Sequence, residues 1–320
     1  MNEINNTLAS ISSYEQFEEL KLTSQIFIEV IKNILERHHL PLKSLQLFSE
    51  GTNVVYAYDN HLVIKLFPPF HQYQFVSERL VLKALAGKLS VKTPTLIHEG
   101  DIAGWPYIIM TKLHGTLLET LWPTLSHDNK LIIIKELGAL IREVHALSTV
   151  GLEAIDCQWP TFIAKQIESC VENHKTKKLN ASLIEQIPAY IGMVTESLRA
   201  SEKSVLLTGE YTPMNFLVTN ITGSWHISGL IDFGDAMLGH YQYDLLGPGA
   251  FLIQGDKELL VNFLTAYGYL SHELNAQLSH QLTALMLLHK YSNLNVQLRI
   301  ADWKSKVSSL KELEQLVWGF

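Results

Sequence analysis

The sequence has little cysteine and no repetitive or low-complexity segment. Only Cys157 and Cys170 are present among 320 residues. Two thiols cannot form a disulfide framework, so we expect them to be buried or free in a reducing compartment. Gly/Ser linkers and internal repeats are also lacking. The chain is therefore predicted to be an ordinary globular protein with one large domain or two lobes.

Long apolar runs are missing too. No run approaches the roughly 18 residues that span a bilayer. The segment LIIIKELGALI at 131–141 is interrupted by Lys135 and Glu136 and predicts a buried helix. Residues 1–20 carry acidic side chains where a signal peptide has basic ones. We therefore expect a soluble, cytoplasmic protein without a membrane partner.

Basic residues are fewer than acidic ones, with 25 Lys and Arg against 32 Asp and Glu. The formal net charge is −7, which argues against nucleic acid or an anionic membrane as the main partner. The same charge is compatible with a cationic small-molecule substrate. We expect a monomer or a weak dimer.

The pattern of apolar residues divides the chain. Up to residue 112 it predicts an amphipathic helix at 24–39 with a Ser24 cap and a stop at Pro41. It then predicts strands in LQLFSE, NVVYAYD and HLVIKLF, a helix at 74–89, and strands in TPTLIHEGD and WPYIIMTKL, bent by Gly100 and Gly104. An Asp59-Asn60 turn separates the second and third of these strands.

The remainder is predicted to be helical at 128–147, roughly 161–200 and most of 255–318, with one hairpin at 215–233. The expected fold is α+β and bilobal. A β-rich lobe with an N-terminal helix would occupy 1–112, and a mainly helical lobe would occupy 113–320. The crevice between two such lobes is a natural ligand site.

The hairpin carries residues suited to phosphoryl transfer. Asp232 ends the strand GLID and is followed by Phe-Gly, a turn well placed to hold Mg²⁺ beside phosphates. Asn215 begins the other arm, so its amide oxygen is expected to reach the same metal. Glu210 lies five residues before Asn215, the acid-to-Asn interval of a kinase catalytic loop. Asp232 alone could merely cap a turn, but the three residues together predict a phosphotransferase site.

A lysine and a glutamate complete the pattern. Lys65 lies on the strand face opposite Leu62, Ile64 and Leu66, and Glu78 lies on the apolar stripe of the next helix. A buried carboxylate needs a partner, and a strand-Lys to helix-Glu pair holds the α- and β-phosphates in kinases. The alternative is that Glu78 lies in water at the edge of the stripe.

Two further segments are candidates for nucleotide contact. SEGTNVVY, with Gly51, Thr52 and Asn53, would be the turn that covers the phosphates, although it contains a single glycine. In WPYIIMTKLHG, main-chain groups of Thr111 and Leu113 would bond adenine and Met110 would line the pocket. An ordinary strand ending in a loop is the alternative.

Three other residues receive less specific interpretations. His145 is predicted to be a hydrogen-bonded helix residue rather than a catalyst. Asp244 is predicted to brace the loop after the metal turn. Asp235, just past that turn, would either contact a cationic acceptor or be a solvated turn residue. No zinc site is expected, because the histidines are not clustered.

The motifs GTNVVY, VIKLF, YIIMTKLHG, TGEYTPMN and IDFGDAMLGHYQYDL occur in the order of the aminoglycoside phosphotransferase family, which has a protein-kinase-like fold. The chain resembles this family over roughly residues 45–250. Within the family it looks most similar to hygromycin B 7''-O-kinases, through SYEQF, GTNVV, VIKLF, WPYIIM and LEQLVWG.

The resemblance implies roles for particular residues. Lys65 and Glu78 would hold the phosphates of ATP or GTP, Asn215 and Asp232 would bind Mg²⁺, and Glu210 would be the catalytic residue. The family loop usually begins His-Gly-Asp, whereas this one begins Thr208-Gly209-Glu210. The departure puts the efficiency of the base in doubt, since a misplacement of about 1 Å can cost on the order of 100-fold in rate.

Three functions are compatible with the sequence. The first is a kinase that phosphorylates a hydroxyl of an aminoglycoside such as hygromycin B and confers antibiotic resistance. The second is a metabolic kinase acting on a sugar, a choline-like alcohol or an amino alcohol. The third is a non-catalytic nucleotide-binding module. The intact Lys65, Glu78, Asn215 and Asp232 favour an active enzyme.

Overall fold

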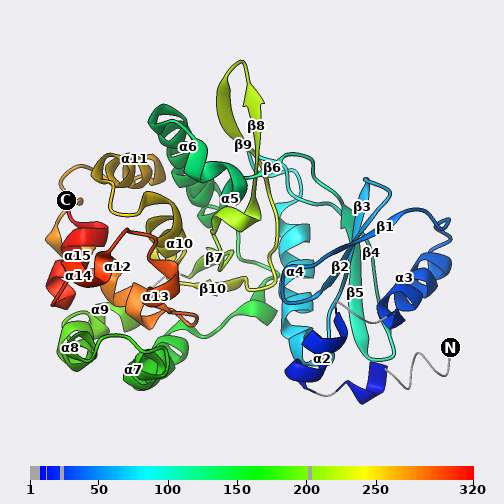
Figure 1. The fold of residues 1–320 in the computed structure, drawn as a ribbon, viewed down its shortest axis with the longest axis horizontal. Helices are drawn as coiled ribbons and strands as arrows, with labels where there is room; N and C mark the ends of the chain where they lie inside the picture. The colour runs from blue at the N-terminus through cyan, green and yellow to red at the C-terminus, as the bar shows by residue number, and fades with distance from the viewer. Residues whose placement is uncertain (1–7, 12, 22–24, 201–203) are drawn as a thin grey trace. The chain divides into compact units, whose positions relative to one another are not determined.

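The protein forms two compact units. The computed structural model describes residues 8–11, 13–21, 25–200 and 204–320. Unit 1 lies within residues 1–88, 92–114 and 233–235, and unit 2 within 89–91, 115–232 and 236–320. Unit 1 contains an antiparallel sheet and unit 2 is mainly helical, so the predicted α+β, kinase-like fold class is confirmed (Figure 1). Among the described helices, none has the length and apolarity to span a bilayer.

A five-stranded antiparallel sheet forms the centre of unit 1. Its spatial order is β1-β2-β3-β5-β4. The strands are β1 (Leu45–Phe48), β2 (Val54–Tyr58), β3 (Leu62–Leu66), β4 (Leu96–Ile102) and β5 (Trp105–Thr111). The Asp59-Asn60 turn between β2 and β3 has positive φ at both residues, the geometry of a tight two-residue hairpin.

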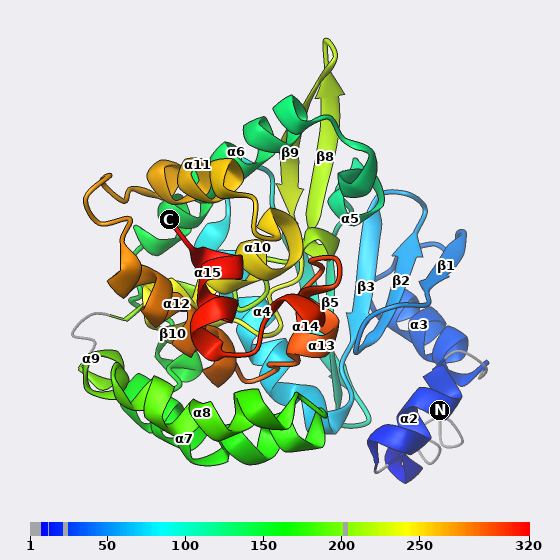
Figure 2. The ribbon, with the colours of Figure 1, turned by 60° about the vertical axis from the view of Figure 1, so that its left-hand side comes forward.

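Helices cover both faces of this sheet. Figure 2 shows α4 (Gln72–Leu85) on one side of the strands and α2 (Tyr14–Lys21) and α3 (Ile26–Arg37) on the other. Because strand side chains alternate, Ile64 and Leu66 of β3 join the core beneath α2 and α3, while Lys65 belongs to the opposite face. This alternation sends the lysine toward α4.

The predicted elements of unit 1 are present with shifted ends. The helix expected at 24–39 is α3, which begins at Ile26; the expected Ser24 cap lies outside the described residues. Helix α4 starts two residues early and ends at Leu85, because Gly87 adopts φ 67°. Gly104 does not bend a strand. It forms the β4–β5 turn with φ 82°.

Unit 2 is built mainly of helices. The stretch expected to be helical at 161–200 is divided into three helices, with Lys178 in a left-handed conformation after the first. Figure 2 shows α7 and α8 lying along each other. The longer helices are α6 (His127–His145), α7 (Trp159–Thr176), α8 (Ala181–Gly192), α11 (Lys257–Tyr267), α12 (Ala276–Leu288) and α15 (Leu310–Trp318). Shorter ones include α5 (Leu118–Leu121), α9 (Thr195–Arg199), α10 (Leu246–Pro248), α13 (Leu294–Gln297) and α14 (Trp303–Lys306).

The predicted hairpin of unit 2 is present. Strands β8 (Phe216–Ile221) and β9 (Ser224–Leu230) turn at Thr222-Gly223 and run beside α6 in Figures 1 and 2. Two features were not predicted. Strand β6 (Thr116–Leu117) adds a third strand to the hairpin, and β7 (Val205–Leu207) pairs with β10 (Met237–Gly239). Strand β7 ends immediately before the loop that carries Glu210.

Candidate active site

A buried ion pair connects β3 and α4 in unit 1. The Nζ of Lys65 lies 2.6 Å from the Oε2 of Glu78. Lys65 is 5% exposed and Glu78 is 1% exposed, and the ammonium lies 5.4 Å from the ring centre of Phe67. The alternative of a solvated Glu78 at the helix edge is therefore wrong. The pair holds an ammonium group in a fixed position at the face of the sheet.

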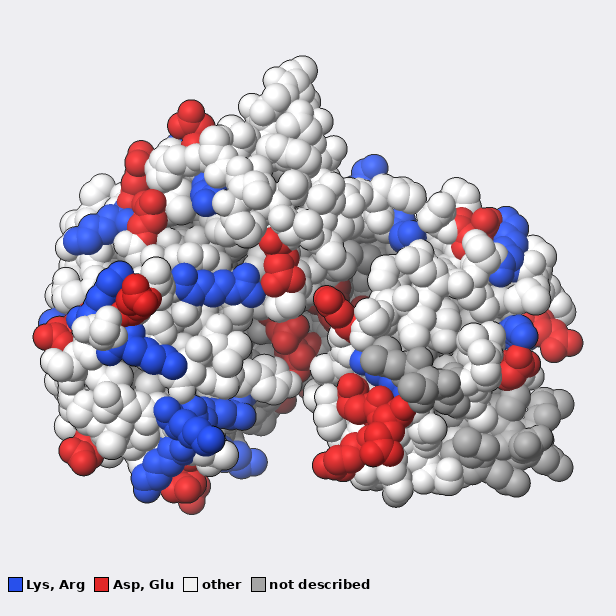
Figure 3. All heavy atoms as spheres, viewed as in Figure 1, with Lys and Arg blue, Asp and Glu red and all other residues white. Residues whose placement is uncertain are grey.

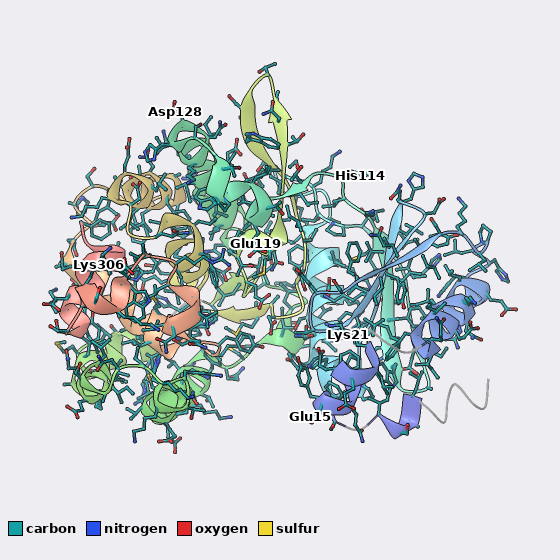
Figure 4. All side chains as sticks on the ribbon, in the orientation of Figure 1. Glu15, Lys21, His114, Glu119, Asp128 and Lys306 are labelled. Atoms are coloured by element: carbon teal, nitrogen blue, oxygen red, sulfur yellow. The ribbon has the colours of Figure 1, made fainter. Side chains whose placement is uncertain are left out.

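The Gly51–Asn53 turn is tied to the same helix. The Nδ2 of buried Asn53 donates to the Oε1 of Gln74 at 2.8 Å, and the hydroxyl of Thr52 donates to that oxygen at 3.4 Å. Gln74 lies one helical turn before Glu78, so one helix positions both groups. From the other side, the ammonium of Lys21, on α2 in Figure 4, donates to the carbonyl of Gly51.

Gln74 also contacts the segment that follows Asp232, the proposed metal ligand. Its Nε2 donates to the Oδ2 of Asp235 at 3.4 Å, and a Cβ added to Gly234 would lie 3.2 Å from the Cβ of Gln74. Asp235 thus belongs to unit 1 and takes part in the network around Gln74. The ring of His71 approaches Asn53, and burial lowers the pKa of this histidine.

The segment proposed to contact adenine ends β5. Met110 is buried and pairs with Val63. The amide of Thr111 donates to the carbonyl of Thr95 at 2.9 Å, so this group is engaged within the sheet. An adenine contact would therefore use the carbonyl of Thr111 and main-chain groups of Leu113.

In unit 2, the hairpin sets the two proposed metal ligands side by side. Phe216 pairs with Leu230 at the base of the hairpin. Just beyond this pair, the amide of Ile231 donates to the carbonyl of Asn215 at 3.0 Å. Asp232 follows directly and adopts φ 65°. A left-handed conformation is uncommon outside glycine and often marks functional sites.

The loop between β7 and the hairpin folds back on Asn215. The Nδ2 of Asn215 donates to the Glu210 carbonyl at 3.0 Å and lies 3.5 Å from its Oε2. The amide of Thr212 also donates to the Glu210 carbonyl, at 2.8 Å. The Glu210 carboxylate is thus held next to the amide of a proposed metal ligand.

Asp244 braces the start of this loop. Its carboxylate accepts from the backbone amides of Thr208 at 2.9 Å and Gly209 at 3.1 Å. His145 of α6 lies 3.3 Å from the same carboxylate through Nε2, and its Nδ1 lies 3.0 Å from the hydroxyl of Tyr267. His145 is therefore a hydrogen-bonded helix residue, as predicted. Asp244 does brace a loop, but it is the one before the hairpin rather than the one after the metal turn.

The same loop packs closely on its neighbours. A Cβ on Gly247 would lie 2.6 Å from the carbonyl oxygen of Tyr211, so only glycine allows this approach. Tyr211 is fully buried. Its burial, with the nearby charge of Asp244, raises the pKa of its phenol, which stays neutral at physiological pH.

We expect Asp244→Asn to destabilise unit 2 and slow turnover. One backbone amide loses its carboxylate acceptor, at a cost of about 1.5–3 kcal/mol. A shift of Glu210 by about 1 Å would lower kcat on the order of 100-fold. Denaturant unfolding and kcat measure the two effects. Asp128→Asn, at an exposed position on α6 (Figure 4), is the control and should change both little. Wild-type kcat in Asp244→Asn would contradict a bracing role.

Two of these residues were missed or misassigned from the sequence. Gln74 was unremarkable as a polar residue early in a predicted helix, and no local signal indicates that it joins three segments. Asp244 was assigned to the wrong loop, because its partners lie about 35 positions earlier in the chain. Neither contact has a sequence signature.

Comparison with known proteins bears on the family and the fold. The family model described as the phosphotransferase enzyme family, APH, matches residues 44–278. Among solved structures, the GDP and kanamycin complex of APH(2'')-IIIa has a TM-score of 0.63 and 20% identity, covering 90% of this chain and 97% of that chain. APH(3'')-Id from Streptomyces rimosus, with ADP and streptomycin, has a TM-score of 0.58 and 14% identity, covering 81% and 98%.

At these identities the solved structures establish the fold alone. The family match is broader evidence, because it spans most of the chain and includes Lys65, Glu78, Glu210, Asn215 and Asp232. On this evidence the chain belongs to the APH phosphotransferase enzyme family.

Proposed function

We propose that this protein is an ATP- or GTP-dependent kinase that phosphorylates a hydroxyl of a small molecule, with an aminoglycoside such as hygromycin B as the acceptor. The observation that carries the proposal is the hairpin of unit 2. It sets Asn215 and Asp232 side by side and holds the Glu210 carboxylate 3.5 Å from the Asn215 amide nitrogen. The similar solved structures are complexes with nucleotides and aminoglycosides, which supports this substrate pair.

Unit 1 would bind the nucleotide. Lys65, oriented by Glu78, would contact the α- and β-phosphates. The turn Gly51–Asn53 would cover the phosphates with its backbone amides, and the Gln74 network would hold that turn in place. Met110 would line the adenine pocket beside main-chain groups of Thr111 and Leu113.

Unit 2 has oxygen ligands that fit Mg²⁺. The nitrogen of the Asn215 amide donates to Glu210, so the oxygen is the atom of this side chain that can coordinate a metal. Asp232 supplies a carboxylate from the same end of the hairpin. Amide and carboxylate oxygens suit a hard divalent cation. When bound, the ion would neutralise phosphate charge during transfer.

Glu210 would accept the proton of the acceptor hydroxyl. The alcohol oxygen bonds to the γ-phosphorus while the bond from that phosphorus to the β-phosphate oxygen breaks. The products are a phosphomonoester, the nucleoside diphosphate and a proton on Glu210. Positioning matters more than base strength in such transfers, so the contacts of the loop with Asn215 and Asp244 are the protein's main contribution here.

Release of ADP or GDP across a panel of aminoglycosides tests the proposal, with mass spectrometry of the product to locate the phosphate. Turnover with hygromycin B that needs Mg²⁺ is the expected result. Tight nucleotide binding without turnover on any aminoglycoside would reject the antibiotic as substrate. A second panel of sugars, choline-like alcohols and amino alcohols then distinguishes a metabolic kinase from a non-catalytic module.

A further inference from the structure

The turn that would cover the phosphates lies outside the ladder of the sheet. Strand β1 ends at Phe48 and β2 begins at Val54, so residues 49–53 connect the two paired strands. Gly51 and Thr52 are exposed to solvent. An exposed backbone segment without ladder bonds keeps one conformation only if other groups hold it. The contacts of this turn therefore decide how its backbone amides are presented.

One of these contacts comes from α2. Lys21 is the last residue of this helix (Figure 4) and is 3% exposed, and its ammonium group donates to the carbonyl of Gly51. The carboxylate of Glu18 lies 3.6 Å from the same nitrogen. A buried ammonium group has lost its hydration and needs such partners. Lys21 is therefore committed to the turn and not to solvent.

Helix α2 is anchored firmly enough to fix this contact. Phe17 is fully buried, and its ring centre lies 5.8 Å from that of Phe70. Phe70 belongs to the short helix η1 (Pro69–His71), in which the Nδ1 of His71 lies 3.3 Å from the Oδ1 of Asn53. Helices α2 and η1 thus pack together and hold the turn at two points.

The bond to the Gly51 carbonyl sets the direction of the next amide. No described peptide bond is cis, and in a trans peptide the C=O and the N–H of the following residue point in opposite directions. Holding the Gly51 carbonyl toward Lys21 therefore presents the N–H of Thr52 on the side away from that ammonium. A cation on the carbonyl also polarises the peptide and strengthens the partial positive charge of the N–H. Backbone amides oriented in this way bind phosphate oxygens.

The surface of α2 indicates that Lys21 acts through this peptide and not on phosphate directly. Three of the eight residues of α2 are glutamates, namely Glu15, Glu18 and Glu19. Asp and Glu dominate the surface over this helix in Figure 3. Like charges repel, so the phosphates are not expected beside α2. Lys21 is therefore a positioning residue.

We propose that α2 positions the nucleotide: Lys21 holds the Gly51 carbonyl so that the amides of the turn face the phosphates of ATP or GTP. This inference rests on the proposed kinase function and adds to it a segment outside the family-matched residues 44–278. Lys21 would contribute to the affinity for the phosphate groups, and not to binding of the base or of the acceptor.

Direct binding to the full chain tests this proposal. Lys21→Met keeps the length of the side chain and removes the donor. The dissociation constants of ATP and adenosine are compared in wild type and variant, with GTP and guanosine as a second pair. We expect the triphosphate to bind on the order of 10-fold more weakly, because a charge-assisted hydrogen bond is lost, and the nucleoside to bind unchanged. In kinetics, KM for the nucleotide should rise while KM for the acceptor stays the same.

Three further variants isolate the bond to Gly51. Lys21→Arg keeps a donor and should restore most of the affinity for ATP. Glu18→Gln removes the other partner of Lys21 and keeps this bond, so the affinity should stay near the wild-type value. Lys32→Met removes the same charge from α3, where Lys32 is 41% exposed, and should change neither dissociation constant. A melting curve confirms that each variant is folded.

Amide hydrogen exchange in the wild type is an independent measurement that needs no variant. ATP should protect the amides of Thr52 and Asn53 from exchange, and adenosine should not. Equal weakening of ATP and adenosine in Lys21→Met, unchanged affinity for ATP, or no protection at Thr52 overturns the inference, while turnover by the wild type leaves the kinase function in place. A wild-type protein that binds no nucleotide overturns both.

Discussion

Replacement of Glu210 by alanine is expected to lower kcat by about 10²- to 10⁴-fold, the usual contribution of a positioned general base. Nucleotide affinity should stay unchanged, because Glu210 lies in unit 2 and would contact the acceptor. Glu210→Gln keeps the shape of the side chain and removes the charge, so it should lose nearly as much. Steady-state kinetics with the best acceptor, together with a thermal shift on nucleotide addition, measure the two properties separately.

Glu210→Asp is the decisive member of the series. The loop holds the longer side chain through the contacts of Asn215 with the Glu210 carbonyl and carboxylate. Aspartate would withdraw the carboxylate by about 1 Å, which should lower kcat on the order of 100-fold. Glu196→Gln, at an exposed position of α9, is the matched control. Full activity of Glu210→Ala would falsify the assignment of the base and favour a non-catalytic module.

Lys65→Met is expected to affect both stability and activity. It removes the cation 2.6 Å from Glu78, a carboxylate that is 1% exposed. Breaking a buried ion pair from one side costs about 3–5 kcal/mol in the free energy of unfolding. Turnover should also fall on the order of 100-fold or more, because a preorganised positive charge on the phosphates is lost. Denaturant unfolding and kinetics measure the two losses.

The double variant Lys65→Met/Glu78→Leu separates these losses. With both charges gone, stability should return to near the wild-type value or exceed it, since burying a charge pair is itself costly. Activity should remain low. Lys83→Met is the control, because the Lys83–Glu99 pair is exposed and such pairs contribute about 0–1 kcal/mol. Recovery of activity in the double variant would show that Lys65 has no role with the nucleotide.

The features that were predictable from the sequence are local ones. The alternation in HLVIKLF placed Lys65 on the face opposite Ile64, and the apolar stripe of the next helix placed Glu78 inward. The hairpin followed from two β-rich runs with a short polar turn, and its register then brings Asn215 and Asp232 together. These results need only the periodicity of strands and helices.

What could not be predicted depends on contacts between distant segments. Gln74 contacts both the Gly51–Asn53 turn and Asp235, and Asp235 lies 161 residues after Gln74 in the chain. The β7–β10 pair consists of two three-residue strands that are too short to show a period. In each case the role of the residue depends on a contact with a distant segment, and that contact cannot be inferred from the local sequence.

The segments outside residues 44–278 bear on where the folding unit ends. Phe17 and Phe27, on α2 and α3, are fully buried and lie 5.9 and 5.8 Å from the ring of Trp105. At the other end, Trp318 of α15 is fully buried, and a Cβ on Gly249 would overlap its ring. A fragment cut to the family-matched range would thus expose aromatic cores at both ends. It would also lose Lys21 and its bond to Gly51. The segment matched by the family model is therefore shorter than the part of the chain that keeps both aromatic cores buried and the Gly51–Asn53 turn in place.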